Sequence, residues 1–158
     1  MRALLQRVRR AEVRIASPWR DGLEAQGEVI GQIGPGMVVL LGVGVQDTAD
    51  MARLLAGRVA HLRIFADDAG RMNRSILDVR GQILSISQFT LYADSSAGRR
   101  PSFTDAAPAE EAEPLYREFN RALEALGVGV VPGRFRAHMI VEIHNDGPVT
   151  ILLDSQCS

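Results

Sequence analysis

The sequence predicts one α+β domain over residues 1–158, in which a curved, antiparallel, barrel-like sheet carries two main helices packed on its outside. Three observations lead to this fold class. The length of 158 residues is close to the commonest size of a single domain. Several short apolar or alternating segments are separated by turn residues, and two longer segments repeat their apolar residues at helical spacing. We find no repeat, low-complexity tract or linker that would divide the chain.

The first third of the chain predicts three strands. Residues 12–15 alternate polar and apolar side chains, which indicates a half-buried strand, and residues 28–33 form a second extended segment. The polar, turn-rich residues 17–27 between them are expected to form a long hairpin tip. The Gly-Pro-Gly sequence at 34–36 predicts a tight turn into the apolar run 37–41, which is typical of a strand covered on both faces.

Two helices follow from apolar periodicity. Asp47 or Thr48 is expected to cap a helix over residues 48–62, whose apolar positions are Met51, Leu54, Leu55, Val59 and Leu62. The second helix has Leu115, Phe119, Ala122, Leu123 and Leu126 on one face and ends at Gly127. Pro114 either marks the first turn of this helix or bends it.

The remaining strands are expected to be joined by turns. Residues 67–70 form a turn, and residues 82–92 predict a strand that leads into a loop over 93–104. Residues 135–144 alternate, and after a turn at 145–148 the segment 149–153 closes the chain as a strand. Because these connections are short, neighbouring strands are expected to be antiparallel.

Composition excludes several functions. The net charge of −1 excludes a polybasic protein that wraps duplex nucleic acid, and no DNA partner is expected. All 18 basic residues are Arg, so neither a Schiff-base lysine nor a P-loop lysine exists. The single Cys157 excludes an internal disulfide, which makes the cytoplasm the simplest location. No apolar run is long enough for a membrane span or a signal peptide. His61, His138 and His144 are scattered and read as structural or exposed, so neither a metal nor another cofactor is expected.

Two segments could carry chemistry. The first is residues 87–94, Ser-Gln-Phe-Thr-Leu-Tyr-Ala-Asp, where hydroxyls and an amide follow a buried strand. These groups either form a functional site or make the hydrogen bonds that the end of the strand requires. Residues 145–150, Asn-Asp-Gly-Pro-Val-Thr, are either a plain turn or a functional loop. Between these segments, Arg99 and Arg100 either hold phosphates or are simply exposed.

These two segments resemble the signature motifs of the D-aminoacyl-tRNA deacylases, a Ser-Gln-Phe-Thr-Leu motif and a Gly-cisPro motif. Further matches run along the chain: LLQRVRRAEV, GQIGPGMVVLLGV, RIFADDAGRMN, RRPSF and GRF. The tip at 17–27 and Pro114 depart from the family pattern. The resemblance implies a homodimeric hydrolase of barrel-like subunits that cleaves the ester between a D-amino acid and the 3′ end of tRNA. Gly147 and Pro148 of one subunit would enter a pocket lined by Ser87, Gln88, Phe89 and Thr90 of the other.

Such an arrangement would exclude L-residues by clash with rigid backbone, and achiral glycine would be accepted. Thr90 has no neighbouring base in the motif, so we expect it to orient the ester or a water molecule, although a nucleophilic role stays open. The 2′-hydroxyl of the terminal ribose would help to activate or position that water. Backbone N–H groups near Gln88 and Phe89 would stabilise the oxyanion, and Phe89 is expected mainly to shape the pocket. Arg99 and Arg100 are candidate tRNA phosphate contacts.

Two rival hypotheses remain at this point. The first is a dimeric RNA- or DNA-associated protein that keeps the fold without the chemistry. The second is a general esterase with a Thr or Ser nucleophile, against which the absence of a G-x-S-x-G motif counts.

Overall fold

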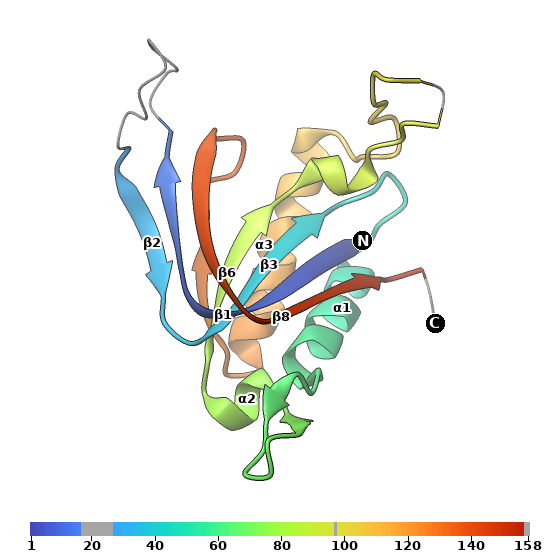
Figure 1. Ribbon diagram of the computed structural model, residues 1–158. Helices are drawn as coiled ribbons and strands as arrows, with labels where there is room; N and C mark the ends of the chain where they lie inside the picture. Colours follow the sequence, from blue (N-terminus) through green and yellow to red (C-terminus); the bar gives the residue numbers. More distant parts are fainter. Residues whose placement is uncertain (17–26, 97, 157–158) are drawn as a thin grey trace.

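A computed structural model describes residues 1–16, 27–96 and 98–156 (Figure 1). One six-stranded sheet follows the order β2-β1-β3-β6-β7, with β8 paired to the other edge of β1. Its strands are β1 (Arg2–Ile15), β2 (Val29–Ile33), β3 (Gly36–Gly42), β6 (Gln82–Ser87), β7 (Gly129–Pro132) and β8 (Met139–Asp154). The sheet curls into a nearly closed barrel-like core, and the long helices α1 (Ala49–His61) and α3 (Ala109–Ala125) cover one face, which confirms the predicted α+β class.

The sheet is mixed rather than purely antiparallel. β1 pairs antiparallel with β2, β3 and β8, but β3–β6 and β6–β7 are parallel pairs. The reason is the length of the connections: α1 lies between β3 and β6, and α3 lies between β6 and β7. A helical crossover returns the chain in its original direction, whereas a short turn reverses it.

β1 and β8 are much longer than predicted. The strand expected at 12–15 begins at Arg2, because the Arg-rich start alternates its exposure and buries Ala3 and Leu5 against the helices. β8 runs through the turn expected at 145–148, because residues on both sides of that segment pair with the same strand, β1. Residues 135–138 lie outside β8, which begins at Met139.

The strand expected over 82–92 ends at Ser87, and the 3₁₀ helix η1 (Phe89–Tyr92) follows it. Both long helices are confirmed. Thr48 caps α1 by accepting a hydrogen bond from the Met51 N–H, and Gly127 follows α3 with a φ of +91°. Pro114 lies within α3, beyond its first turn. The small elements β4 (Phe65–Ala66), β5 (Met72–Arg74) and α2 (Ile76–Val79) complete the fold.

The core has two parts because the central strands β3 and β6 bury side chains on both of their faces. One cluster lies between the sheet and the helices, and its largest fully buried side chain is Phe119. The second cluster fills the curl of the sheet with Val8, Val38 and Leu84 among others. In the described part of the chain, no helix is both long enough and apolar enough to cross a membrane.

Candidate active site

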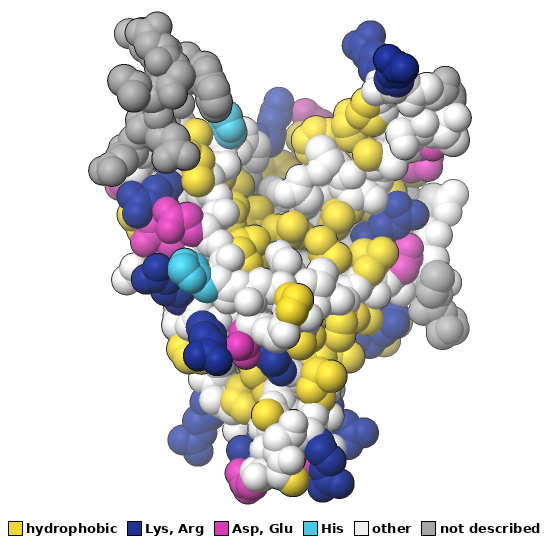
Figure 2. Space-filling view, viewed as in Figure 1, with side chains coloured by type: hydrophobic (Ala, Val, Ile, Leu, Met, Phe, Trp, Pro, Cys, Tyr) yellow, Lys and Arg dark blue, Asp and Glu magenta, His cyan; other side chains and the backbone are white. Residues whose placement is uncertain are grey.

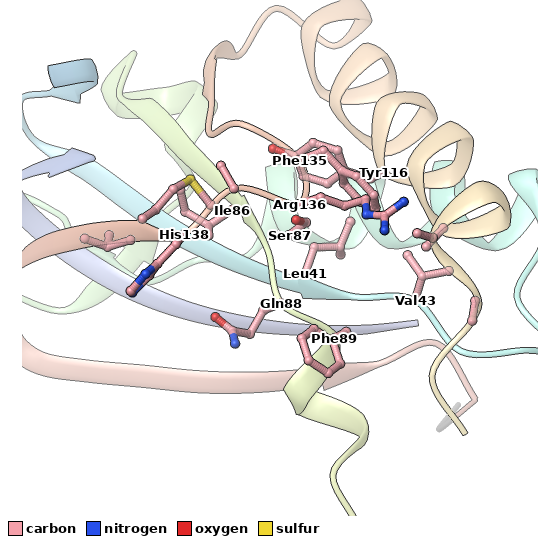
Figure 3. A pocket seen from close by; sticks show the side chains of 16 residues that line it. Leu41, Val43, Ile86, Ser87, Gln88, Phe89, Tyr116, Phe135, Arg136 and His138 are labelled. Atoms are coloured by element: carbon pink, nitrogen blue, oxygen red, sulfur yellow. The ribbon is translucent and has the colours of Figure 1, made fainter. Parts of the chain in front are cut away.

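A pocket of about 530 Å³ opens at the end of the sheet where β6 meets η1, α3 and the segment before β8. In Figure 2, the upper end of the molecule is hollowed at this place and hydrophobic side chains show inside the hollow. The side chains labelled in Figure 3 that line it are Leu41, Val43, Ile86, Ser87, Gln88, Phe89, Tyr116, Phe135, Arg136 and His138. The structure therefore brings three of the four predicted catalytic-segment residues into one pocket.

The pocket edge is set by the way β6 ends. The Gln88 N–H donates to the Leu41 carbonyl over 2.8 Å, which continues the β3–β6 pairing by one residue. Gly42 permits this approach, because a Cβ there would lie 3.1 Å from the Gln88 carbonyl oxygen. This bond corrects one expectation: the Gln88 N–H already has an acceptor and is not free to bind an oxyanion. The N–H groups of Phe89 and Thr90 open η1, and the 3₁₀ pattern gives them no acceptor within the turn.

Thr90 is exposed beside the pocket and is not among its lining residues. Its hydroxyl accepts a hydrogen bond from the Gln88 side-chain amide. Phe89 lines the pocket with 57% of its surface exposed, and its ring meets Phe103 edge to face with centroids 5.0 Å apart. Phe103 belongs to the 93–104 segment that also carries the exposed Arg99 and Arg100, which do not line the pocket.

An aromatic wall faces Ser87 from α3 and the segment before β8. The buried Tyr116 hydroxyl donates to the Ser85 carbonyl over 2.8 Å, and burial raises the pKa of Tyr116. The Phe135 ring lies 5.9 Å from the Tyr116 ring, centroid to centroid. Motif reasoning did not single out Tyr116, because its position on a helix face reads as ordinary core. Phe135 lies in the Gly-Arg-Phe match, which was the available signal.

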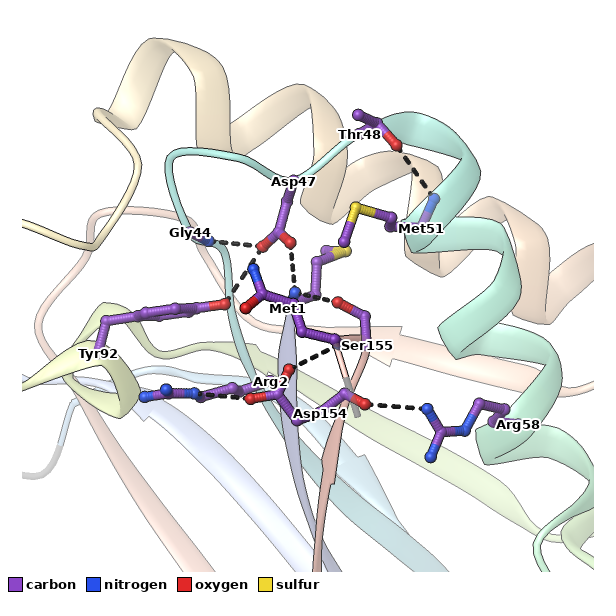
Figure 4. Close-up of polar contacts among 11 residues, drawn as sticks. Met1, Arg2, Gly44, Asp47, Thr48, Met51, Arg58, Tyr92, Asp154 and Ser155 are labelled. Carbon is purple, nitrogen blue, oxygen red and sulfur yellow. Dashed lines mark hydrogen bonds and ion pairs between the residues drawn. The ribbon is translucent and has the colours of Figure 1, made fainter. Parts of the chain in front are cut away.

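The end of η1 is anchored by a polar cluster that includes its last residue, Tyr92 (Figure 4). The Tyr92 hydroxyl donates to the Asp47 carboxylate over 3.3 Å, and the Arg2 guanidinium lies 4.5 Å from the centre of the Tyr92 ring. Asp47 also accepts hydrogen bonds from the Gly44 N–H, over 2.6 Å, and from the amino group of Met1. Burial raises the pKa of the Tyr92 phenol above its usual range, so the phenol stays protonated and remains a donor.

The second predicted motif forms a bulge in β8. Gln6 of β1 pairs with Thr150, and Val8 pairs with Asn145. The single residue Arg7 therefore lies opposite the four β8 residues 146–149. The Gly147–Pro148 peptide bond is cis, as the resemblance implied, and both residues are exposed. They do not line the pocket of their own chain.

Polar contacts fix this bulge from both sides. The Asn145 side-chain amide donates to the backbone carbonyls of Arg7, over 2.9 Å, and of Val149, over 3.1 Å. Asp146 forms ion pairs with Arg7 at 3.2 Å and with Arg9 at 3.0 Å. The hydrogen bond from Arg9 lowers the pKa of the Asp146 carboxyl, which therefore remains charged around neutral pH. The bulge thus presents Gly147 and Pro148 outwards from a fixed base.

Within residues 1–16, 27–96 and 98–156, no group of three or more His, Cys, Asp or Glu side chains is placed to hold a metal ion. His138 lines the pocket without such a group around it. Cys157 and residues 17–26 of the expected long tip lie outside the described residues. Of the tip expected at 17–27, only Gly27 is described.

The pocket and the bulge carry the two motifs that characterise one hydrolase family, and comparison with known proteins identifies it. The family model described as D-Tyr-tRNA(Tyr) deacylase matches residues 4–154. The chain belongs to this family.

Individual relatives agree over almost the whole length. A protein named D-aminoacyl-tRNA deacylase from Deinococcus radiodurans is 56% identical over 154 residues, which cover 98% of this chain and 99% of that protein. One of the same name from Roseiflexus castenholzii is 56% identical over 155 residues, covering 98% and 92% of the two chains.

Among solved structures, the "c-Myc DNA Unwinding Element Binding Protein" matches with a TM-score of 0.85 and 38% identity, covering 98% of each chain. A probable eukaryotic D-amino acid tRNA deacylase matches with a TM-score of 0.76 over 96% of this chain and 97% of that one. At 17% identity, this second match supports the fold alone.

Proposed function

We propose that this protein hydrolyses the ester bond of D-aminoacyl-tRNA to give free tRNA and a D-amino acid, and that it spares L-aminoacyl-tRNA. The observation that carries the proposal is the pocket itself, in which Ser87, Gln88 and Phe89 of one motif face the aromatic wall of Tyr116 and Phe135. Such a site can take the terminal adenosine against aromatic rings and place the ester beside η1. The family membership and the relatives' names support the same reaction.

The complete site is proposed to need a second copy of the chain. Gly147 and Pro148 are exposed but do not reach the pocket of their own subunit. On the sheet face away from the helices, Leu4 is paired with Leu40 on one side and Leu152 on the other, and Leu152 is 57% exposed. This three-strand apolar patch is suited to burial against its own symmetry mate.

Chirality would be judged by backbone rather than by a reactive side chain. The bulge residues are held by Asn145 and Asp146, so the Gly147–Pro148 segment cannot yield when it meets a substrate. An L-side chain directed at that segment would clash, while a D-side chain would point away from it. Glycine has no side chain to clash, so we propose that glycyl-tRNA is also hydrolysed.

For the chemical step, we place the developing oxyanion on the N–H groups of Phe89 and Thr90 at the start of η1. Thr90 would orient the ester or the attacking water, because its hydroxyl is already bonded to the Gln88 amide and no basic side chain is bonded to it in the described part of the chain. The 2′-hydroxyl of the terminal ribose would help to position that water. Neither a metal nor an organic cofactor takes part in this scheme.

The direct test is hydrolysis of D-Tyr-tRNA and L-Tyr-tRNA by the purified protein, followed as release of tyrosine. We expect the D-ester and glycyl-tRNA to be cleaved and the L-ester to survive at the same enzyme concentration. Equal cleavage of D- and L-Tyr-tRNA would instead show a general esterase.

The cross-subunit arrangement is tested by mixing two inactive variants. Ser87→Trp fills the pocket, and Gly147→Trp places a bulky side chain on the bulge, where it would block the pocket that the bulge enters. If the site is shared between subunits, hybrid dimers contain one intact pocket facing one intact bulge, and an exchanged equal mixture recovers about a quarter of wild-type activity. If each subunit forms its own complete site, the mixture stays inactive.

Contacts with the tRNA beyond its 3′ end are proposed for Arg99 and Arg100, which are exposed on the loop that carries Phe103 beside the pocket. We expect the Arg99→Ala, Arg100→Ala double variant to weaken binding of D- and L-aminoacyl-tRNA equally, since phosphates carry no information on chirality. The proposed place of action is the cytoplasm, where aminoacyl-tRNA is used.

A second candidate function is nucleic-acid binding without chemistry, which is favoured by the name of the DNA unwinding element binding protein at 38% identity. The net charge of −1 argues against strong duplex binding at physiological salt. Binding of a duplex DNA fragment without hydrolysis of D-Tyr-tRNA would favour this candidate over the deacylase.

A further inference from the structure

Arg136 has an unusual backbone conformation at the edge of the pocket. Its φ is +59°, in the left-handed region that glycine occupies readily and that residues with a Cβ occupy at a cost in free energy. It lies in the short segment before β8, where the Ala137 N–H donates to the Arg134 carbonyl over 3.2 Å. Glycine would meet the needs of this turn more easily, so the turn itself does not explain an arginine.

The Arg136 side chain lines the pocket, and Figure 3 shows it beside Phe135 and Tyr116 with its guanidinium directed towards α3. It is exposed, and within the described residues its guanidinium has no hydrogen-bond or ion-pair partner. Among the described residues, the side chains that line the pocket include no Asp or Glu. An arginine carries five N–H donors and a permanent charge, so this one is available to an anion that enters the pocket.

The amino end of α3 reaches the same pocket. Ala109, the first residue of the helix, and Ala112 both line it, and the helix has no side-chain cap. The acidic residues of the first turn, Glu110 and Glu111, are exposed and do not line the pocket. A helix amino end and a guanidinium both favour negative charge. Two positive features therefore meet in one pocket, and no described residue that lines it is a carboxylate.

Resting on the proposed function, we propose that Arg136 binds the phosphate that joins the terminal adenosine of the substrate to the preceding nucleotide. This phosphodiester is the anion nearest to the ester in an aminoacyl-tRNA. Arg136 is then a specificity residue that favours the end of an RNA chain over a free aminoacyl-nucleoside. It touches the substrate away from the reacting bond, so it contributes to binding rather than to the chemical step.

The test compares Arg136→Gly, Arg136→Lys and the matched control Arg134→Ala on two substrates, D-Tyr-tRNA and the D-tyrosyl ester of adenosine, which has no phosphate. Arg134 is also exposed and lies two residues away, but it does not line the pocket. For Arg136→Gly on D-Tyr-tRNA, we expect KM to rise about tenfold with kcat unchanged. The slope of log kcat/KM against log salt should become shallower by about 0.7. Arg136→Lys keeps most of the affinity, and Arg134→Ala behaves as wild type.

The adenosine ester separates the phosphate contact from other roles. Wild type and Arg136→Gly should cleave it equally, and Arg136→Gly should melt no lower than wild type, because glycine relaxes at this φ. The proposal is overturned if Arg136→Gly loses activity equally on both substrates, or if its KM for D-Tyr-tRNA matches that of Arg134→Ala. Wild-type protein that cleaves neither D-ester would overturn the proposed function and this assignment together, a result distinct from either of the others.

Discussion

Arg7 should be the principal support of the Gly147–Pro148 bulge, and replacing it by alanine tests this role. Its guanidinium donates to the Ile64 carbonyl over 2.6 Å and pairs with Asp146 at 3.2 Å, and only 16% of its side-chain surface is exposed. A Cβ built at Gly147 would lie 3.2 Å from an Arg7 nitrogen, which shows how closely the guanidinium approaches the bulge. Arg7→Ala therefore removes both a buried contact and the neighbour that fixes Gly147.

The magnitude follows from the contact with Ile64. Ile64 is only 3% exposed, and a hydrogen bond from a charged donor contributes about 1.5–3 kcal/mol, so we expect Arg7→Ala to lower the free energy of unfolding by about 2 kcal/mol. With a urea m-value of about 2 kcal/mol/M, the unfolding midpoint falls by about 1 M. In the same protein, kcat/KM for D-Tyr-tRNA should fall at temperatures where the variant is still fully folded, because the bulge is no longer held.

Arg9→Ala is the matched control. Arg9 also pairs with Asp146, at 3.0 Å, but 83% of its side chain is exposed, and exposed ion pairs contribute little. We expect little change in its midpoint or activity. Equal effects of the two substitutions, or full activity of folded Arg7→Ala, would refute the reasoning that burial of Arg7 fixes the bulge.

Three further outcomes are expected. Thr90→Ala should keep a measurable part of the wild-type rate. Intact-protein mass spectrometry during turnover should find no acyl group on Thr90 in the wild type. An acyl-Thr90 adduct in the wild type, together with complete loss of activity in the variant, would establish Thr90 as a nucleophile. Because the Asp146 pKa is lowered from 3.8, its charged form stabilises the fold above that pH and this contribution disappears as pH falls through the lower, folded-state value. Stability measured against pH should therefore fall less in Asp146→Asn than in the wild type at the acid end, and identical profiles would contradict the assignment. Tyr116→Phe should lower stability by about 1 kcal/mol, or about 2–4 °C in Tm by calorimetry. The loss of stability is no larger because the Ser85 carbonyl still accepts a hydrogen bond from the Gly133 N–H over 2.8 Å. An unchanged Tm would mean that the Tyr116 hydroxyl contributes nothing to stability.

Local patterns in the sequence were sufficient where local forces decide the structure. The helix predicted over 48–62 forms as Ala49–His61, because its apolar spacing and the Thr48 cap act within a few residues of each other. The first motif also stood out as hydroxyls and an amide at the end of a buried strand, and the second as a Gly-Pro segment that resembles the Gly-cisPro motif. By contrast, the turn predicted at 145–148 became a bulge, since its fate depends on β1, which lies more than a hundred residues away in the chain.

The sequence by itself determined the α+β class, the helices and the two segments that carry the family motifs, because periodicity, capping and motif order are properties of neighbouring residues. Only the tertiary structure decided that β6 ends at Ser87 and that the Gln88 N–H donates to the Leu41 carbonyl. It also decided that Tyr116 and Arg136 line the same pocket as Ser87 and Gln88. Those facts depend on which distant segments pack together. Packing is a balance over the whole chain, which no single stretch of residues contains.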